Sequence, residues 1–371
     1  MVGGVALFRH LPQLAGRVPW ATLGSWPTPL DEIRIDGRPI WIKREGDSST
    51  RYGGNKVRTL EAWLGHARDV GARRIWAIGA YGSNHAIATV LHARALGLDA
   101  GAVVFPQPAS EWAHENAGAL IGAGCPIVRL RSVIEVPFAG VALAAWDRWS
   151  QLASVAGRVL GARRGEPGLS LVMPPGGATP IGTLGALSAA FELAEQIDAQ
   201  LAPPPRRIVL PVGSTCTTAG LLAGIALARA LGVWRWPAPI IHAVRVTPWP
   251  VTSRALIAML ARATLARIAR LGGPRVELDA SLLVVDHREL GAGYGKLTDR
   301  AHVAMAALAG PGGPRLDGVY AGKAAAALLR LHRERVEPLV FWATKSTTQL
   351  EPPAMQELER APRALARWLA R

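Results

Sequence analysis

Short apolar segments alternate with helix-patterned segments along most of the chain, and this alternation limits the folds available to it more than any other feature. Predicted strands lie at residues 74–79, 100–105, 126–130, 169–173, 208–212, 240–246, 281–285 and 339–343. Predicted helices lie at residues 84–96, 110–121, 141–156, 186–196, 219–231, 253–270, 298–309, 323–333 and 353–371. Strands separated by helices at this spacing pair in parallel, and the helices cover the faces of the sheet. We therefore expect an α/β fold.

The length and composition are sufficient for two domains. A chain of 371 residues, of which 50% are hydrophobic, can bury a large core, and chains of this size commonly divide. Near the start, an alternating segment at 33–42 turns at Asp36-Gly37 and predicts a β-hairpin in addition to the strands above.

The formal net charge of +15 suggests nucleic-acid binding, but the distribution of the arginines does not support that function. They occur singly or in pairs and form no basic stripe interleaved with aromatic residues. The two cysteines, Cys125 and Cys216, form no C-x-x-C pair, as is typical of the reducing cytoplasm. We find neither a signal-peptide pattern nor an apolar run long enough to span a membrane. We therefore expect a cytoplasmic protein that binds neither nucleic acid nor membrane.

Lysine is rare in this chain, which has five lysines and thirty-seven arginines. Lys56 follows Gly53-Gly54-Asn55, and an amphipathic helix pattern begins directly after it. Two glycines let the backbone pass close to a flat ligand. The positive end of a helix dipole lowers the pKa of a lysine toward the free amine that forms Schiff bases. This stretch alone fits a Schiff-base lysine and a solvated turn lysine equally well.

Two polar turns each join a predicted strand to a predicted helix, at the edge of the sheet where α/β proteins bind ligands. The first, residues 79–85, contains Ser83 and Asn84, and by itself it favours a helix cap over a ligand site. The second, residues 212–220, offers four hydroxyl groups and backbone N–H groups at a helix N-terminus. That composition favours anion binding over a simple capped turn.

Three further side chains are candidates because of their positions. Tyr294 and Tyr320 are two of only four tyrosines, and each lies in a turn near glycine, where a phenol faces either a cavity or the surface. Thr344 follows the predicted strand at 339–343 and places a neutral donor and acceptor at another strand end. The nine histidines show no paired metal-ligand spacing, and the Gly-x-Ser-x-Gly motif is absent. We expect no metal site.

Taken in order, these motifs resemble the fold-type II pyridoxal-phosphate enzymes, in the branch that contains D-cysteine desulfhydrase and 1-aminocyclopropane-1-carboxylate (ACC) deaminase. The resemblance covers residues 25–350 and rests on Lys43-Arg44-Glu45, Gly53-Gly54-Asn55-Lys56-Val57-Arg58, Ser83-Asn84-His85, Pro174-Pro175-Gly176-Gly177 with Gly182 and Gly185, Gly213-Ser214 with Thr217, Ala219 and Gly220, Tyr294-Gly295, and Val319-Tyr320 with Gly322-Lys323. Several motifs in one order are more specific than any one of them.

The resemblance implies a fold and a domain division. The fold consists of two three-layer α/β/α domains with open, twisted, mostly parallel sheets, as in the β subunit of tryptophan synthase. Residues 1–50 and 165–371 would form a larger domain that binds the cofactor phosphate, and residues 51–164 a smaller one. The active site would lie in the cleft between them. By analogy with the family, the protein would form a homodimer.

The resemblance also implies a role for each candidate residue. Lys56 would hold pyridoxal 5′-phosphate as a Schiff base and then act as the catalytic base. Asn84 would bind the 3′-oxygen of the cofactor, and Thr344 would lie near its pyridine nitrogen. The cofactor phosphate would be held by Gly213, Ser214, Thr215, Cys216, Thr217 and Thr218. The small amino-acid substrate would be contacted by Ser83, Asn84, His85, Tyr294 and Tyr320, with Ser83 either touching its carboxylate or relaying a proton.

Three positions distinguish the two activities of this branch. ACC deaminases carry glutamate, glutamine and leucine where this chain has Ala321, His85 and Thr344, whereas desulfhydrases carry threonine, histidine and threonine. The resemblance implies that a neutral Thr344 near the pyridine nitrogen would leave that nitrogen unprotonated, which would suit elimination of a good leaving group such as thiolate. We therefore expect α,β-elimination, with D-cysteine converted to pyruvate, ammonia and hydrogen sulfide. ACC deamination, and binding of cofactor or amino acid without turnover, remain alternatives.

The chain departs from the family pattern at several site positions. Thr215 and Cys216 replace the glycines usual in the phosphate loop, and Lys345-Ser346 replaces a Gly-Gly pair. Gly82 stands where glutamine is usual. We expect the extra side chains to narrow the loop or to crowd the pyridine ring, with altered substrate or activity as the consequence.

Overall fold

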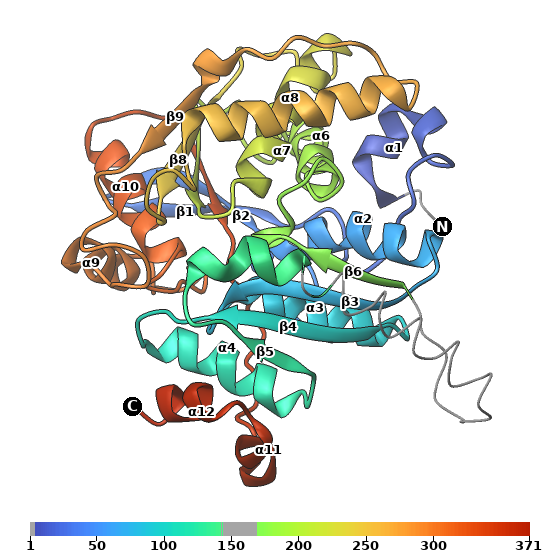
Figure 1. The fold of residues 1–371 in the computed structure, drawn as a ribbon. Helices are drawn as coiled ribbons and strands as arrows, with labels where there is room; N and C mark the ends of the chain where they lie inside the picture. Colours follow the sequence, from blue (N-terminus) through green and yellow to red (C-terminus); the bar gives the residue numbers. More distant parts are fainter. Residues whose placement is uncertain (1–3, 142, 144–168) are drawn as a thin grey trace. The chain divides into compact units, whose positions relative to one another are not determined.

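The computed structural model describes residues 4–141, 143 and 169–371 (Figure 1). The chain forms two compact units. The first comprises Met1–Trp63 and Gly177–Gln349, and the second comprises Leu64–Gly176 and Leu350–Arg371. The domain division predicted at residues 51–164 stays a prediction, and the helix predicted at 141–156 falls almost wholly outside the described residues.

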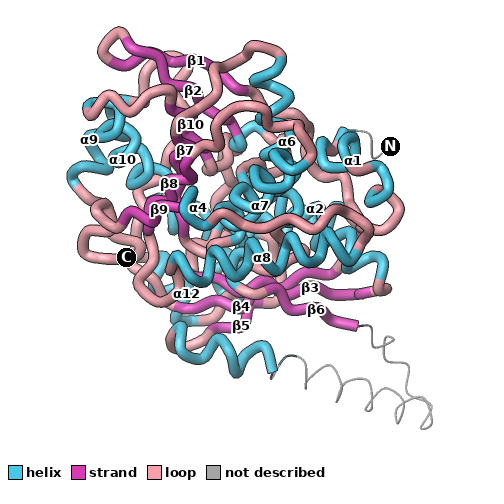
Figure 2. The backbone as a smooth tube through the Cα atoms, turned by 90° about the horizontal axis from the view of Figure 1, so that it is seen from above, coloured by secondary structure: helices cyan, strands magenta, loops and turns pink. Residues whose placement is uncertain are grey.

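The first unit is built on a six-stranded sheet with the strand order β1-β2-β10-β7-β8-β9. Its strands are β1 (Leu30–Ile35), β2 (Arg38–Arg44), β7 (Arg207–Val212), β8 (Ile240–Arg245), β9 (Leu283–Asp286) and β10 (Leu339–Ala343). β1 and β2 form the predicted antiparallel hairpin, whose turn places Asp36 and Gly37 at positive φ. The remaining neighbours pair in parallel, and Figure 2 shows them side by side. The sheet is thus mostly parallel, as predicted.

Helices cover both faces of this sheet. One face carries α1 (Ala6–His10), α6 (Leu184–Asp198), α7 (Cys216–Ala230) and α8 (Arg254–Arg270), and the other carries α9 (Asp299–Ala307) and α10 (Ala321–Arg333). Val340 and Trp342 of β10 enter the core on the first face, whereas Leu339 and Phe341 enter the core on the second. Because side chains alternate along a strand, one apolar run supplies both cores. The result is the predicted three-layer arrangement.

The second unit is built on a four-stranded parallel sheet with the order β5-β4-β3-β6. Its described elements are β3 (Ala72–Ala80), α3 (Asn84–Ala95), β4 (Asp99–Phe105), α4 (Glu111–Gly122), β5 (Ile127–Arg129), β6 (Leu169–Met173), α11 (Met355–Arg360) and α12 (Arg363–Leu369). The single helix predicted over 353–371 is wrong, because the chain breaks at Ala361-Pro362. Proline has no N–H for a helix interior and holds the preceding residue in extended backbone.

The helix α2 (Asn55–Asp69) begins in the first unit and carries Lys56 in its first turn. Among the described residues, no helix combines the length and apolar composition needed to cross a membrane.

Candidate active site

Lys56 follows a tight turn that packs against the end of β10. Gly54 has a φ of +95°, and a Cβ there would lie 2.7 Å from the carbonyl oxygen of Thr344. The backbone N–H of Asn55 donates to the same oxygen at 3.3 Å. The turn therefore brings Lys56 and Thr344, two residues of the predicted site, next to each other. Lys56 is half-buried, and burial lowers the pKa of its amine, against a smaller opposing effect of Cys216.

The predicted anion-binding loop leads directly into α7. The helix begins at Cys216, three residues before the predicted start, so Thr217 and Thr218 lie in its first turn. The hydroxyl of Thr218 is buried and has no hydrogen-bond partner among the described residues. Gly213, Ser214 and Thr215 precede the helix and are half-buried. Unpaired N–H groups and hydroxyls at the N-terminus of a helix bind anions, because the helix dipole adds to their hydrogen bonds.

One hydrogen bond joins this loop to the lysine helix. The side-chain amide of Asn55 donates to the hydroxyl of Thr217 at 2.8 Å. The first turn of α2 and the first turn of α7 are therefore in direct contact. No role was predicted for Asn55 from the sequence, although its position between the two glycines and Lys56 indicated that it lies in the site.

The thiol of Cys216 contacts two polar groups. Its Sγ lies 3.6 Å from the carbonyl oxygen of Gly177 and 3.7 Å from the hydroxyl of Thr59. Burial raises the pKa of this thiol. These contacts account for the side chain, so any part of Cys216 in anion binding falls to its backbone N–H.

Lys345, which replaces a glycine of the family pattern, is buried and directed at an aromatic ring. Its ammonium nitrogen lies 6.0 Å from the centroid of Tyr52. The Thr344-Lys345 segment thus places the longer side chain against Tyr52, which is itself buried.

Tyr294 and Tyr320 form a hydroxyl pair beside the predicted anion-binding loop. Their phenolic oxygens lie 2.7 Å apart. A Cβ on Gly213 would come within 3.0 Å of Cε1 of Tyr320, so the Tyr320 ring lies against the loop. Burial raises the pKa of Tyr294 to about 12 and raises that of Tyr320 well above its ordinary value. Both phenols are therefore protonated at neutral pH and can donate hydrogen bonds.

A second buried lysine holds the turn that carries Tyr294. The ammonium group of Lys323, on the first turn of α10, donates to the carbonyl oxygens of Leu290 at 2.8 Å and Gly293 at 2.9 Å. Tyr320 is the N-cap residue of the same helix. Lys323 therefore links the two tyrosines through the backbone. No role was predicted for Lys323, although the rarity of lysine in the chain was a signal.

In the second unit, Ser83 acts as the N-cap of α3, because its hydroxyl accepts a hydrogen bond from the N–H of Ala86 at 3.2 Å. The alternative that the turn caps a helix is thus confirmed. The amide nitrogen of Asn116 donates to the carbonyl oxygen of Gly82 at 2.9 Å and to Oδ1 of Asn84 at 3.0 Å. Because a carbonyl only accepts, this arrangement orients both amides. His85 is buried. The ligand-binding roles of Ser83, Asn84 and His85 stay predictions.

The first unit therefore brings the lysine, the predicted anion-binding loop, the tyrosine pair and Thr344 into one continuous set of contacts. A model of the family described as pyridoxal-phosphate dependent enzyme matches residues 21–341. The chain belongs to this family. The resemblance inferred from the motif order is confirmed, and so are the cofactor and the enzyme class.

Curated members of the pyridoxal-phosphate dependent family extend the comparison. The chain is 39% identical to Nocardicin C-9′ epimerase of Nocardia uniformis subsp. tsuyamanensis over 57% of this chain and 61% of the epimerase. The match thus spans less than two thirds of that relative. The chain is 28% identical to the mitochondrial bifunctional D-cysteine desulfhydrase/1-aminocyclopropane-1-carboxylate deaminase of Arabidopsis thaliana, over 83% of this chain and 72% of the relative.

A solved structure of an ACC deaminase homologue has the same fold. It superposes with a TM-score of 0.71 at 27% identity and covers 92% of this chain and 95% of that chain. The predicted fold-type II architecture is thereby confirmed.

The residues of the first unit fit pyridoxal phosphate. The amine of Lys56 has a lowered pKa, as a Schiff-base lysine requires. The N-terminus of α7 has the groups that a phosphate needs, among them the buried hydroxyl of Thr218, which has no hydrogen-bond partner within the described part of the chain. Asn55, the residue before Lys56, donates a hydrogen bond to the hydroxyl of Thr217 in that helix at 2.8 Å. When bound, the cofactor withdraws electrons from the amino-acid Cα and makes its proton acidic.

Proposed function

We propose that this chain is a pyridoxal-phosphate dependent lyase that catalyses α,β-elimination on a small amino acid. The observation that carries the proposal is the contact between Asn55 and Thr217, which joins the lysine helix to the anion-binding helix at 2.8 Å. D-Cysteine is the proposed substrate, with pyruvate, ammonia and hydrogen sulfide as products. Thr344 and His85 support it, since both agree with the desulfhydrase pattern, and the bifunctional relative of Arabidopsis thaliana carries that activity in its name.

In this proposal each described side chain has a chemical task. The loop from Gly213 to Thr218 holds the cofactor phosphate through the N-terminus of α7. The amine of Lys56 takes the proton from the substrate Cα, and the lowered pKa that burial gives it favours the free amine that this step needs. The protonated pair of Tyr294 and Tyr320 donates hydrogen bonds to the substrate and to the departing thiolate. Ser83, Asn84 and His85 keep their predicted binding roles.

Epimerisation of an amino acid is a second candidate, because the chain is 39% identical to Nocardicin C-9′ epimerase. Both reactions start with removal of a proton by a positioned base. They then diverge, since a lyase expels a β-substituent whereas an epimerase returns a proton to the other face. A tyrosine hydroxyl that stays protonated at neutral pH is a suitable donor for that return.

We further propose that the protein is a cytoplasmic homodimer. The two cysteines without a pairing pattern support the compartment, and the habit of the family supports the assembly.

One set of assays tests these proposals. Purified protein is mixed with pyridoxal phosphate, and the absorbance of the bound cofactor is recorded before and after borohydride. Pyruvate is then measured from D-cysteine, L-cysteine, D-serine and ACC. In parallel, each amino acid is incubated in deuterium oxide, and its Cα exchange and chirality are followed. Lys56→Ala is the control.

The outcomes separate the candidates. Pyruvate from D-cysteine supports the lyase, pyruvate from ACC favours ACC deamination, and exchange with inversion but no pyruvate favours the epimerase. A cofactor band with neither product nor exchange favours binding without turnover. A band that persists in Lys56→Ala overturns the lysine assignment, and the absence of any band overturns every one of these functions.

A further inference from the structure

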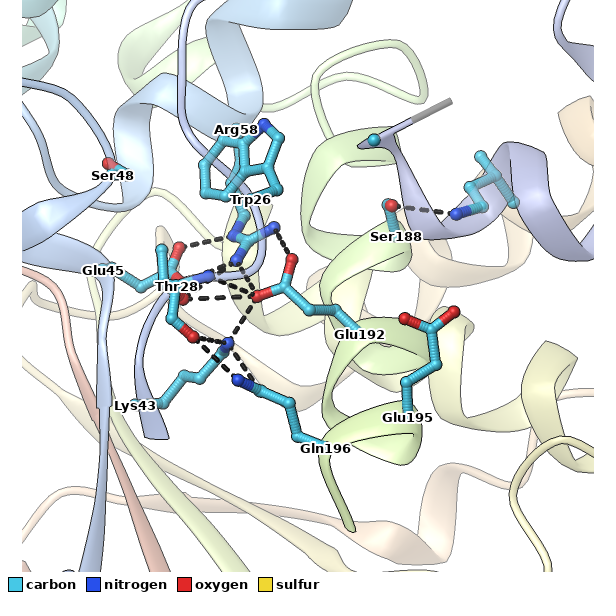
Figure 3. Close-up of polar contacts among 12 residues, drawn as sticks. Trp26, Thr28, Lys43, Glu45, Ser48, Arg58, Ser188, Glu192, Glu195 and Gln196 are labelled. Carbon is cyan, nitrogen blue, oxygen red and sulfur yellow. Dashed lines mark hydrogen bonds and ion pairs between the residues drawn. The ribbon is translucent and has the colours of Figure 1, made fainter. Parts of the chain in front are cut away.

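Two residues beyond Lys56, Arg58 belongs to a buried cluster of four charged side chains (Figure 3). We call Lys43, Glu45, Arg58 and Glu192 the charge cluster. The exposed fraction is 0% for Lys43 and Glu45, 3% for Arg58 and 2% for Glu192. Two positive and two negative groups cancel, so the cluster places no net charge beside Lys56. The contacts of the cluster fix the geometry of the segment that carries Lys56.

Arg58 is held by both carboxylates of the charge cluster. Its Nε and Nη2 donate to Glu45 at 2.6 and 2.8 Å. Its Nη1 and Nη2 donate to Glu192 at 3.1 and 2.8 Å. The guanidinium also stacks on Trp26, with Cζ 3.9 Å from the ring centroid. Only a planar guanidinium can fork to two carboxylates in this way.

The far side of Glu192 is held by Lys43. The ammonium group of Lys43 donates to Glu192, to the carbonyl oxygen of Thr28 at 2.7 Å and to Oε1 of Gln196 at 2.7 Å. The N–H of Thr28 donates to Glu192 at 3.0 Å. Lys43 lies on β2 and Glu192 lies on α6. These contacts therefore connect Arg58 to the six-stranded sheet.

Glu45 contacts the chain on both sides of Lys56. Its backbone carbonyl accepts from the N–H of Gly54 at 2.7 Å, two residues before the lysine. Its carboxylate binds Arg58, two residues after the lysine. One residue thus brackets the segment that carries the amine.

Close backbone packing adds an independent constraint at the same place. A Cβ on Gly185, in the first turn of α6, would collide with the backbone carbonyl of Arg58. A Cβ on Gly53 would likewise collide with the carbonyl of Gly46. Only glycine permits backbone contacts this close. The backbone before Lys56 is therefore packed against Gly46, and the backbone after it is packed against Gly185.

A buried ion cluster is a poor source of stability, because desolvation of the charges offsets their attraction. Its value is the definite arrangement that it imposes. We propose that the charge cluster is a positioning device for Lys56, and that Arg58 is the residue through which it acts. The proposal rests on the proposed function, in which the amine of Lys56 reacts with the carbonyl of pyridoxal phosphate, and it assigns no contact between Arg58 and the ligand.

The test measures the reactivity of Lys56 itself. Pyridoxal phosphate is added to each protein, the reaction is stopped with borohydride at successive times, and the modified peptide is identified by mass spectrometry. The variants are Arg58→Lys, which keeps the charge but loses the fork, and Glu192→Gln, which keeps the shape. Either variant serves if the other fails to fold.

Asp286→Asn is the matched control for lost stability. Asp286 is a buried carboxylate in the same unit, bound by His242 at 3.0 Å and by Arg288 at 3.0 Å, and none of its hydrogen bonds or ion pairs among the described residues involves α2. It should lower the melting temperature as the other variants do and leave the modification rate of Lys56 unchanged. Arg68→Lys, at an exposed arginine of α2, controls for the chemical change.

We expect Arg58→Lys and Glu192→Gln to slow modification of Lys56 by about 10-fold or more, since small misplacements of a reacting group have effects of this size. The proposal is overturned if both variants are modified at the wild-type rate, or if Asp286→Asn slows the reaction equally. Absence of modification at Lys56 in the wild type would instead overturn the proposed function.

Discussion

The side-chain amide of Asn55 donates a hydrogen bond to the hydroxyl of Thr217 across 2.8 Å, and these residues lie 162 positions apart in the chain. The bond joins the residue before Lys56 to the first turn of α7. A lysine that forms a Schiff base and a helix end that holds a phosphate must keep a constant separation if one cofactor is to meet both. The Asn55–Thr217 hydrogen bond helps to fix the distance between the start of α2 and the start of α7.

Removal of the Thr217 hydroxyl should therefore weaken cofactor binding. We expect Thr217→Val to raise the apparent Kd for pyridoxal phosphate by about 5- to 10-fold, because a hydrogen bond of this kind contributes about 1 kcal/mol. A titration followed by absorbance measures the change. Thr264→Val is the control, since the Thr264 hydroxyl is bonded at 2.7 Å to Thr183 in the same unit. An equal loss of affinity in the control would contradict the prediction.

The tyrosine pair should matter for turnover more than for cofactor binding. We expect Tyr320→Phe to lower kcat by about 100-fold, the usual scale for loss of a general acid or base. Cofactor affinity should change little, since the ring beside Gly213 remains. Steady-state kinetics and cofactor titration on the same preparation separate the two. If kcat and cofactor affinity fall together, the hydroxyl also contributes to cofactor binding and the prediction is wrong.

The titration of Tyr294 predicts how stability changes in alkali. Its pKa is raised to about 12, above its unfolded value of about 10. The folded state therefore keeps a proton that the unfolded state has lost, and this contribution to stability is present below pH 10 and disappears as the pH rises toward 12. Denaturant unfolding of wild type and Tyr294→Phe at pH 9 and 11 should show that the wild type loses more stability than the variant. An identical loss in both proteins would refute the assignment.

Lys323 should show the opposite pH dependence. Burial lowers its pKa to about 8, below its unfolded value of about 10.4. Between these values the unfolded state holds more protons, so stability rises with pH. We expect the stability of the wild type relative to Lys323→Met to increase from pH 7.5 to 9.5. The variant should also show a raised KM, because the turn at Leu290 and Gly293 loses its two hydrogen bonds.

Thr215 adopts backbone angles that suit glycine. Its φ is +68°, the left-handed region, which is costly for a β-branched residue. We expect Thr215→Gly to stabilise the protein by about 1 kcal/mol without loss of cofactor affinity, since relief of strain exceeds the added freedom of the unfolded chain. Ser214→Gly is the control, because Ser214 lies outside that region and should lose about 0.5 to 1 kcal/mol on substitution. Thermal and denaturant unfolding measure both. Equal destabilisation of the two variants would contradict the strain argument.

The predicted order of strands and helices is confirmed over most of the described chain. Hydrophobic periodicity is a local property, so a strand such as β10 could be predicted from five residues alone. Helix boundaries that depend on the backbone conformation of one residue were harder to predict. The break at Ala361-Pro362 divides a helix predicted as one, and α7 begins at Cys216 because Thr215 turns left-handed immediately before it.

By itself the sequence determined the fold class, the family, and the turns at strand ends where ligand-binding groups gather. These depend on composition, period and motif order, all of which are read along the chain. Only the tertiary structure decided what holds Lys56. Arg58 meets Glu45, thirteen residues away, and Glu192, 134 residues away, because the turn that follows β2 lies together with the start of α2 and with α6 in the same unit. No local sequence pattern predicts these contacts, because the sequence does not show whether an arginine is buried or solvent-exposed.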